Sequence, residues 1–232
     1  MKIRDLIFPQ TIKCFMCGCE IADSGVCGEC YGKLPWVRGN LCERCGGVVL
    51  GTGSVCNDCS GEKFYFHRNF NVFNYVDDMQ KNILRFKKGR KYLGYYFSEI
   101  MREYLEKLPI HFDYIIPMPI HENRLKERSF NQSDVLVEKL KDKYVVDSSV
   151  LKRIKDTPHQ TGLNKSNRKS NLDKAFEVID KDKVKDKIIL VVDDIYTTGS
   201  TLNECAKTLV KSGAKGVYGL CLARAVFNDV LE

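Results

Sequence analysis

Residues 64–222 alternate between two patterns of apolar and polar positions. Short apolar runs predict strands, and segments in which apolar residues recur every three to four positions predict helices. The predicted strands span residues 70–75, 114–116, 145–154, 175–179, 188–192 and 217–222, and the predicted helices span residues 77–86, 92–108, 131–140 and about 200–211. Strands that alternate with helices favour an α/β fold with a mostly parallel sheet flanked by helices.

The first 60 residues lack both patterns and are rich in cysteine instead. Nine of the eleven cysteines in the chain lie between Cys14 and Cys59. Eight of them form four C-x2-C pairs, namely Cys14 with Cys17, Cys27 with Cys30, Cys42 with Cys45, and Cys56 with Cys59. In a reducing compartment such a density favours metal ligands over disulfides, and four thiolates suit a tetrahedral zinc ion.

We therefore predict two structural zinc sites with four thiolates each. Bound zinc contributes on the order of 10–16 kcal/mol in small zinc fingers, which is enough to define a fold in so short and polar a segment. Pairing the first C-x2-C with the second and the third with the fourth is the simpler arrangement, and an interleaved pairing stays open. Cys19 is expected to remain free, and Cys205 and Cys221 are expected to lie in the core.

The change of composition near residues 60–68 predicts a domain boundary. We expect a small double zinc ribbon domain, with four cysteines for each zinc ion, at residues 1–66 and an α/β domain at residues 67–232. No apolar run is long enough to cross a bilayer and the N-terminus lacks the apolar segment of a signal peptide, so we expect a cytoplasmic protein without membrane insertion. The net charge of +7 favours anionic partners without identifying them.

One segment of fourteen residues, 188–201, combines a buried strand with candidate chemistry. Five apolar residues lead directly into Asp193 and Asp194, which should therefore emerge at the carboxyl end of a central strand, where open α/β folds bind ligands. The free amides of the next helix, Gly199 and the hydroxyls of Thr197, Thr198, Ser200 and Thr201 are suited to cradle a phosphate. The two carboxylates suit the hydroxyls of a sugar that carries this phosphate. The competing interpretation is a solvated strand end followed by an ordinary helix cap.

This segment closely resembles the ribose-phosphate-binding motif of the type I phosphoribosyltransferases. The hydrophobic run, the two acids and the T-T-G-x-T loop recur here without a gap. The resemblance implies that Asp193 and Asp194 hold the 2′ and 3′ hydroxyls of phosphoribosyl pyrophosphate (PRPP). It also implies that the loop at 197–201 holds the 5′-phosphate, and that the pyrophosphate leaves with Mg²⁺ bound.

Further segments resemble the ComF family over essentially the full length of the chain. They are the four C-x2-C pairs, LRFKKGR at 84–90, PMP at 117–119, RLKERSFNQ at 124–132, QTGL at 160–163, Arg168 and Asn171. At Ser129 that family more often has glycine, which affects the backbone expected there. The resemblance implies a role in natural competence, with incoming single-stranded DNA and a ComFA-like helicase as partners.

Three basic segments have candidate roles beside such a site. Arg124 and Arg128 follow the stiff 117–119 loop and are candidates for contacting pyrophosphate, unless they belong only to a solvated helix start. The polar segment 157–171 resembles the mobile lid of these folds and carries Arg168 as a further pyrophosphate candidate. Residues 84–91 gather five basic side chains around Phe86, which either stacks on a nucleic-acid base or is buried in the helix stripe.

The sequence leaves two functions open. The first is a PRPP-binding protein of the ComF type that acts in natural competence on incoming single-stranded DNA. The second is a metabolic phosphoribosyltransferase that transfers phosphoribose from PRPP to a nucleobase or an amine. The absence of a recognisable apolar hood for a base favours the first function, and whether the chain turns PRPP over stays open in both.

Overall fold

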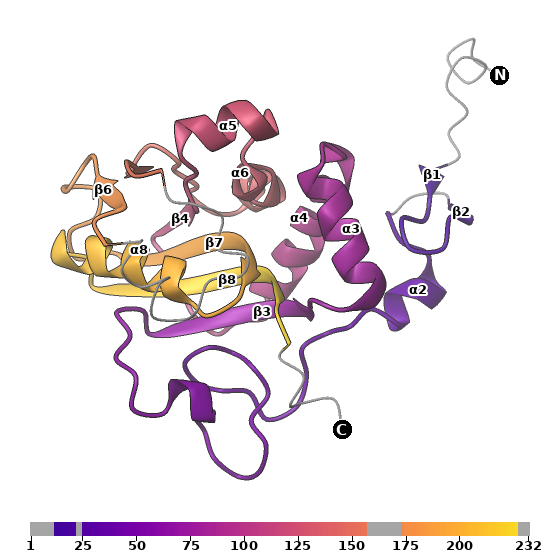
Figure 1. Ribbon diagram of the computed structural model, residues 1–232, viewed down its shortest axis with the longest axis horizontal. Helices are drawn as coiled ribbons and strands as arrows, with labels where there is room; N and C mark the ends of the chain where they lie inside the picture. Colours follow the sequence, from indigo (N-terminus) through magenta and orange to yellow (C-terminus); the bar gives the residue numbers. More distant parts are fainter. Residues whose placement is uncertain (1–11, 22–24, 157–172, 227–232) are drawn as a thin grey trace.

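The computed structural model describes residues 12–21, 25–156 and 173–226 (Figure 1). Its centre is a sheet of four strands in the order β3-β8-β7-β4, all parallel to their neighbours. These strands are β3 (Arg68–Asn74), β4 (Tyr114–Pro117), β7 (Ile188–Tyr196) and β8 (Gly216–Arg224). The mostly parallel sheet expected from the apolar runs is confirmed, because four of the runs form its strands.

Helices cover both faces of the sheet, and alternate residues of β7 show which helices face which side. Leu190 and Val192 pack into a core with α3 (Asp77–Lys87), α4 (Lys91–Leu105) and α6 (Gln132–Leu136). Ile189 and Val191 pack into a second core with α8 (Ser200–Lys211). All four of these strand side chains have no exposed surface. This two-sided burial is why the run at 188–192 is continuously apolar rather than alternating.

Two expected strands form only short elements. In the run at 145–154, Val146 makes an isolated parallel bridge with Ile115 of β4 at the edge of the main sheet, and residues 151–153 form β5 (Leu151–Arg153). The run at 175–179 yields β6 (Phe176–Val178). These two strands pair antiparallel as a separate two-stranded sheet. Their outward positions, such as Lys152 and Glu177, are exposed, so each strand has only one apolar face to bury. The expected helix at 131–140 is also divided, into α6 and the 3-10 helix η2 (Glu138–Asp142).

The cysteine-rich segment packs against the sheet domain at two separate places. Its first part contains β1 (Ile12–Lys13), β2 (Glu20–Ile21) and α2 (Gly28–Gly32), and its Phe15 ring lies 5.5 Å from the ring of Phe97 in α4. Its second part contains the 3-10 helix η1 (Asn57–Cys59) and lies along β3, where Asn71 Nδ2 donates to the carbonyl of Cys45 at 2.8 Å. Figure 1 shows α2 beside α3 and the second part on the other side of β3.

The segment between the two cysteine-rich parts continues the main sheet at its β3 edge. Trp36 forms an antiparallel bridge with Phe73, and the amide of Val37 donates to the carbonyl of Val72 at 3.0 Å. The Trp36 ring also lies 4.7 Å from the Phe73 ring. The boundary near residue 66 stays a prediction, and β3 begins two residues after it. None of the described helices combines the length and the apolar character needed to cross a bilayer.

Candidate functional site

Asp193 and Asp194 lie near the carboxyl end of β7, at the edge where α8 begins. The strand continues past both acids to Tyr196, because β8 pairs with it as far as Arg224. Asp193 Oδ1 accepts hydrogen bonds from the amide of Asp194 at 2.8 Å and from the Ser133 hydroxyl at 3.4 Å. Both acids are only partly buried. The acid pair is therefore ordered by its own strand and by α6, and it remains within reach of a ligand.

The loop that follows has the backbone shape of an anion-binding turn. Gly199 has a φ of 74° and precedes α8, whose first-turn amides have no partner inside the helix. The Thr198 and Ser200 hydroxyls lie 2.9 Å apart. A Cβ at position 199 would come within 2.2 Å of the Tyr196 hydroxyl. Glycine is therefore needed here both for the positive φ and for the close packing on Tyr196.

Lys87, the last residue of α3, contacts the acid pair. Its Nζ lies 2.7 Å from Asp194 Oδ2, and the two side chains are 23% and 13% exposed. Sequence reasoning assigned this lysine only to a general basic segment. Its position depends on the packing of α3 against the sheet, which sequence spacing does not reveal.

A group of arginines forms the other side of the site. Arg124 and Arg128 belong to α5 (Glu122–Arg128), and Arg153 lies on β5 with 6% of its surface exposed. Burial lowers the pKa of Arg153, and the charge of Arg124 lowers it further, whereas Asp193 acts in the opposite direction. Burial and the charge of Arg128 likewise lower the pKa of Arg124. Sequence reasoning missed Arg153 because β5 carries no motif.

Two sequence details around α5 are explained by its end. Ser129 adopts a left-handed φ of 65° at the C-terminus of the helix, a conformation that glycine takes without strain. Asn131 then caps α6 by accepting a hydrogen bond from the amide of Ser133 at 3.1 Å. The third candidate for pyrophosphate, Arg168, lies outside the described residues with the whole segment 157–172.

The electrostatics of the acid pair favour a protonated Asp193 up to near neutral pH. Burial and the adjacent charge of Asp194 raise the pKa of Asp193 to about 7, and the charges of Lys87 and Arg153 limit this rise. A neighbouring negative charge disfavours the ionised form of a carboxyl group. A protonated Asp193 can donate a hydrogen bond, and the side-chain oxygens of Asp194 can accept one.

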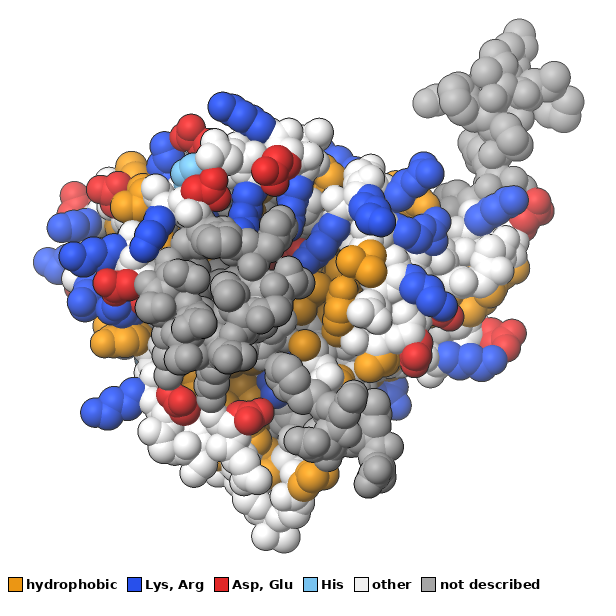
Figure 2. Space-filling view, viewed as in Figure 1, with side chains coloured by type: hydrophobic (Ala, Val, Ile, Leu, Met, Phe, Trp, Pro, Cys, Tyr) orange, Lys and Arg blue, Asp and Glu red, His pale blue; other side chains and the backbone are white. Residues whose placement is uncertain are grey.

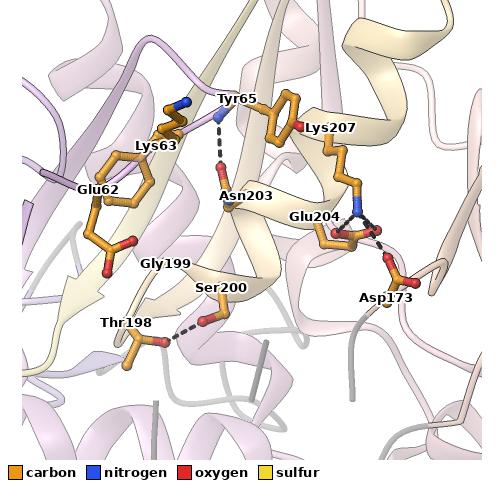
Figure 3. A pocket seen from close by; sticks show the side chains of 11 residues that line it. Glu62, Lys63, Tyr65, Asp173, Thr198, Gly199, Ser200, Asn203, Glu204 and Lys207 are labelled. Atoms are coloured by element: carbon orange, nitrogen blue, oxygen red, sulfur yellow. Dashed lines mark hydrogen bonds and ion pairs between the residues drawn. The ribbon is translucent and has the colours of Figure 1, made fainter. Parts of the chain in front are cut away.

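A cavity of about 260 Å³ adjoins the loop at 197–201 on the side of α8 (Figure 3). Asn203 Oδ1 accepts from the amide of Tyr65 at 2.7 Å along one wall, and Lys207 lies between Glu204 and Asp173 on the other. The remaining lining side chains include Glu62, Lys63 and Phe64. The cavity has more acidic than basic side chains, so it does not itself favour an anionic group.

The predicted metal ligands form two clusters of sulfur atoms. In the second cluster the sulfurs of Cys42, Cys45, Cys56 and Cys59 all lie within 4.8 Å of one another. The Cys45 and Cys56 sulfurs are 3.6 Å apart, close to the roughly 3.8 Å edge of a tetrahedron of four sulfurs around zinc with 2.3 Å bonds. This set fits a zinc ion and matches the simpler pairing, third C-x2-C with fourth.

The first cluster contains one sulfur more than a zinc ion needs. Its mutually close sulfurs are those of Cys14, Cys17, Cys19 and Cys27, so Cys19 does not lie apart as expected. Cys30 adjoins the same group, because its amide donates to the Cys27 sulfur at 3.5 Å. Burial raises the pKa of the Cys30 thiol, and the neighbouring sulfurs of Cys27, Cys17 and Cys14 raise it further. Five thiols thus surround the place where four are required.

Other expectations about single residues are settled by burial. Phe86 has no exposed surface and packs on Phe97 and Phe130, so the hypothesis that it stacks on a nucleic-acid base is wrong. Cys205 and Cys221 are buried in the core on the α8 side of the sheet, as predicted.

Two family models match the chain in consecutive parts. The model of the Double zinc ribbon domain matches residues 3–60, and the model of the Phosphoribosyl transferase domain matches residues 128–227. The two cysteine clusters and the strand, acid pair and loop described above lie within these respective matches.

Curated relatives match nearly the whole chain. Competence protein F of Haemophilus influenzae is 29% identical over 227 residues, covering 92% of this chain and 97% of the relative. Competence protein ComFC of Bacillus subtilis is 27% identical over 221 residues, covering 88% and 85%. DNA utilization protein YhgH of Escherichia coli is 28% identical over 226 residues, covering 92% and 97%.

The solved structure of a phosphoribosyltransferase superposes only weakly on this chain. Purine phosphoribosyltransferase from Pyrococcus horikoshii Ot3 gives a TM-score of 0.33 at 20% identity, covering 70% of this chain and 83% of that one. The two family models and the relatives that match nearly the whole chain show the similarity more clearly. The chain is therefore similar over nearly its whole length to competence and DNA utilization proteins, and it consists of a double zinc ribbon domain followed by a phosphoribosyl transferase domain.

Proposed function

We propose that the chain binds PRPP at the carboxyl edge of its sheet. Asp193 and Asp194 accept and donate hydrogen bonds to the ribose hydroxyls, and the loop at 197–201 holds the 5′-phosphate. The observation that carries this proposal is that β7 delivers an acid pair and, directly after it, a positive-φ glycine at the start of α8. Each charge-assisted hydrogen bond to the phosphate contributes roughly 1.5–3 kcal/mol, so a few of them suffice to fix it.

The pyrophosphate of PRPP is assigned to the arginine side of the site. Burial is the largest cause that lowers the pKa of Arg153 and of Arg124. The charges of Arg124 and Arg128 lower the pKa of Arg153 further, and the charge of Arg128 lowers the pKa of Arg124 further. A polyanion between these side chains relieves their mutual repulsion. Arg168 remains a candidate for the same group. Mg²⁺ would accompany the pyrophosphate and neutralise part of its charge.

The biological role that we propose is the handling of incoming single-stranded DNA during natural competence, beside a ComFA-like helicase. The names of the relatives support it, since two are competence proteins and another is a DNA utilization protein. PRPP binding would then regulate this process or complete it chemically.

A basic surface on α3 and α4 supports contact with a nucleic-acid backbone. Between Asp78 and Glu99 the chain has six basic residues and no acidic one. Within this stretch Tyr92 and Tyr95 are 45% and 43% exposed, so aromatic faces accompany the positive charges. Figure 2 shows Lys and Arg side chains beside exposed apolar atoms in the region of these helices.

Calorimetric titration of PRPP with Mg²⁺ tests the first part of the proposal. We expect the wild-type chain to bind and the Asp193→Asn, Asp194→Asn variant to lose binding. Asp142→Asn, a change of an exposed acid in η2, serves as the matched control. Failure of folded, zinc-loaded wild-type protein to bind would refute the proposal, and circular dichroism must show that the variant is folded. Release of pyrophosphate on adding a nucleobase or an amine would instead identify a metabolic transferase.

A further inference from the structure

The second cysteine cluster (Cys42, Cys45, Cys56 and Cys59) packs into the same hydrophobic core as the residues that flank the loop at 197–201. Cys42, Cys45 and Cys59 belong to the same group of buried side chains as Tyr196 and Leu202, which flank the loop. The first cluster belongs to the other core, where Cys14 packs with residues of α3 and α4. The two clusters have similar cysteine spacing but pack into different cores.

The Tyr196 side chain packs against the backbone of the loop at Gly199. Its side chain is 4% exposed, and its hydroxyl lies so close to Gly199 that a Cβ there would be 2.2 Å away. The backbone of the loop therefore rests on the phenol, and any movement of this ring displaces the loop. Close-packed interiors transmit such displacements rather than absorb them.

Arg224 joins Tyr196 to the second cluster. It is the residue of β8 that pairs with Tyr196 of β7, and its guanidinium carbon lies 5.4 Å from the centre of the Tyr196 ring. Its Nη1 donates to the carbonyl of Cys45 at 3.3 Å. The guanidinium also lies against Gly47, where a Cβ would approach its carbon to 2.4 Å.

The turn of the second cluster is fitted tightly against this arginine and against β3. A Cβ at Gly46 would come within 2.3 Å of the Asn69 carbonyl oxygen, and Asn71 Nδ2 donates to the carbonyls of Cys45 at 2.8 Å and Gly46 at 3.1 Å. When metal is bound, its thiolate bonds fix the conformation of the turn together with these contacts, because bound zinc supplies much of the folding free energy of so small a segment. The carbonyl that Arg224 binds is the carbonyl of one of these ligand residues.

We propose that the second cysteine cluster is a structural part of the phosphate site, and that Arg224 and Tyr196 transmit its order to the loop at 197–201. Loss of metal from this cluster then loosens the loop and lowers its affinity for PRPP, whereas loss of metal from the first cluster does not. This inference rests on the proposed function for its ligand. Arg224 and Tyr196 act as positioning residues and need not touch the ligand.

Two matched double variants test this inference. Cys56→Ser with Cys59→Ser disrupts the second cluster without changing Cys45, and Cys14→Ser with Cys17→Ser disrupts the first. We expect each variant to lose one zinc ion per chain by elemental analysis. Only the second-cluster variant should bind PRPP more weakly, by about 5- to 150-fold, the range of ordinary coupling between sites. Amide hydrogen exchange of peptides that contain residues 197–202 should also be faster only in that variant.

A second pair of variants leaves all cysteines intact. Arg224→Met removes the hydrogen bond to the Cys45 carbonyl and keeps an unbranched side chain, and Arg102→Met removes an arginine that pairs only with Glu99 and Glu106 among the described residues. Arg224→Met should keep both zinc ions, bind PRPP at least about fivefold more weakly and exchange faster at 197–202. Arg102→Met should behave as wild type in all three measurements.

The outcomes separate this inference from the proposed function. If wild-type protein fails to bind PRPP, the proposed function is wrong, and the exchange measurement still decides whether the second cluster orders the loop. If Arg224→Met and the second-cluster variant match wild type in exchange and in affinity, the coupling is refuted. It is equally refuted if the first-cluster variant loosens the loop to the same extent.

Discussion

Lys87 Nζ lies 2.7 Å from Asp194 Oδ2, so the end of α3 reaches the acid pair at the end of β7. The ion pair is largely shielded from water, which makes it stronger than a surface ion pair. It connects the basic segment of the sequence to the site that we assign to the ribose, although the two are far apart along the chain.

Removing this lysine should alter the pH dependence of ligand binding. Burial and Asp194 raise the pKa of Asp193, and the charge of Lys87 lowers it. In Lys87→Met we expect the pH midpoint of PRPP binding to rise and the free energy of unfolding to fall by about 2 kcal/mol. Lys87→Arg should keep the wild-type pH midpoint and the wild-type free energy of unfolding. Lys88→Met, a change of an exposed neighbour, is the control. An unchanged pH profile in Lys87→Met would show that Lys87 has no influence on the acids.

Asp193→Asn should stabilise the chain at alkaline pH. The pKa of Asp193 rises from 3.8 to about 7 on folding, so the folded chain holds this proton longer than the unfolded chain. The free energy of unfolding therefore falls as the pH rises from about 4 to about 7, by at most about 4 kcal/mol for a shift of this size. Asparagine removes this fall.

Urea unfolding at pH 4 and at pH 8 measures the difference. The variant should gain stability over wild type at pH 8 and little at pH 4, at the expense of PRPP binding. Asp142→Asn should show no such dependence. Equal effects of Asp193→Asn at both pH values would contradict a raised pKa.

Gly199→Ala should cost more than glycine replacement at a position with open space. The new methyl group would collide with Tyr196, and the φ of 74° adds backbone strain. Gly89→Ala is a matched control, because Gly89 has a φ of 99° but nothing within 4 Å of an added Cβ. Thermal unfolding should show a loss of about 1–3 kcal/mol from steric overlap in Gly199→Ala beyond the loss in the control. Similar losses in the two variants would mean that the loop does not rest on Tyr196.

The extra thiol of the first cluster predicts redundancy in zinc binding. Elemental analysis of protein purified without chelators should give two zinc ions per chain. Cys19→Ser alone and Cys30→Ser alone should each retain both ions, because four thiols remain, and the double variant should lose one. A value near zero in the wild type would refute the zinc ribbon, and loss of an ion in either single variant would identify the fixed ligand set.

DNA binding should weaken with salt in proportion to the number of phosphates that α3 and α4 neutralise. For single strands log K falls with log salt by about 0.7 per phosphate. Lys88→Gln with Arg90→Gln should reduce this slope by about 0.7 for each phosphate that is no longer neutralised, whereas Lys33→Gln, a lysine paired with Glu29 on α2, should not. Fluorescence anisotropy with an oligothymidylate at several salt concentrations measures it. A flat salt response would rule out binding to the DNA backbone.

The sequence alone determined the centre of the sheet and the identity of the acid pair. A continuous apolar run such as 188–192 is compatible only with burial on both sides, and the acids that follow it must then lie at the edge where the strand ends. The C-x2-C spacing likewise predicted the four sulfurs of the second cysteine cluster, because two thiols in one tight turn approach the same metal, although it did not predict that Cys19 joins the first cluster. These inferences succeeded because each depends on interactions within a few residues.

The tertiary structure decided which distant residues meet. Lys87 and Arg153 approach the acids only because α3 and β5 pack beside β7, and no local pattern records that packing. The same is true of Phe86, which is buried rather than available for stacking, and of Arg224, whose hydrogen bond to Cys45 depends on the second cluster lying against β3 and β8. Side chains from separate elements are brought together by the summed burial of apolar surface, and this sum is a property of the whole fold rather than of any one segment.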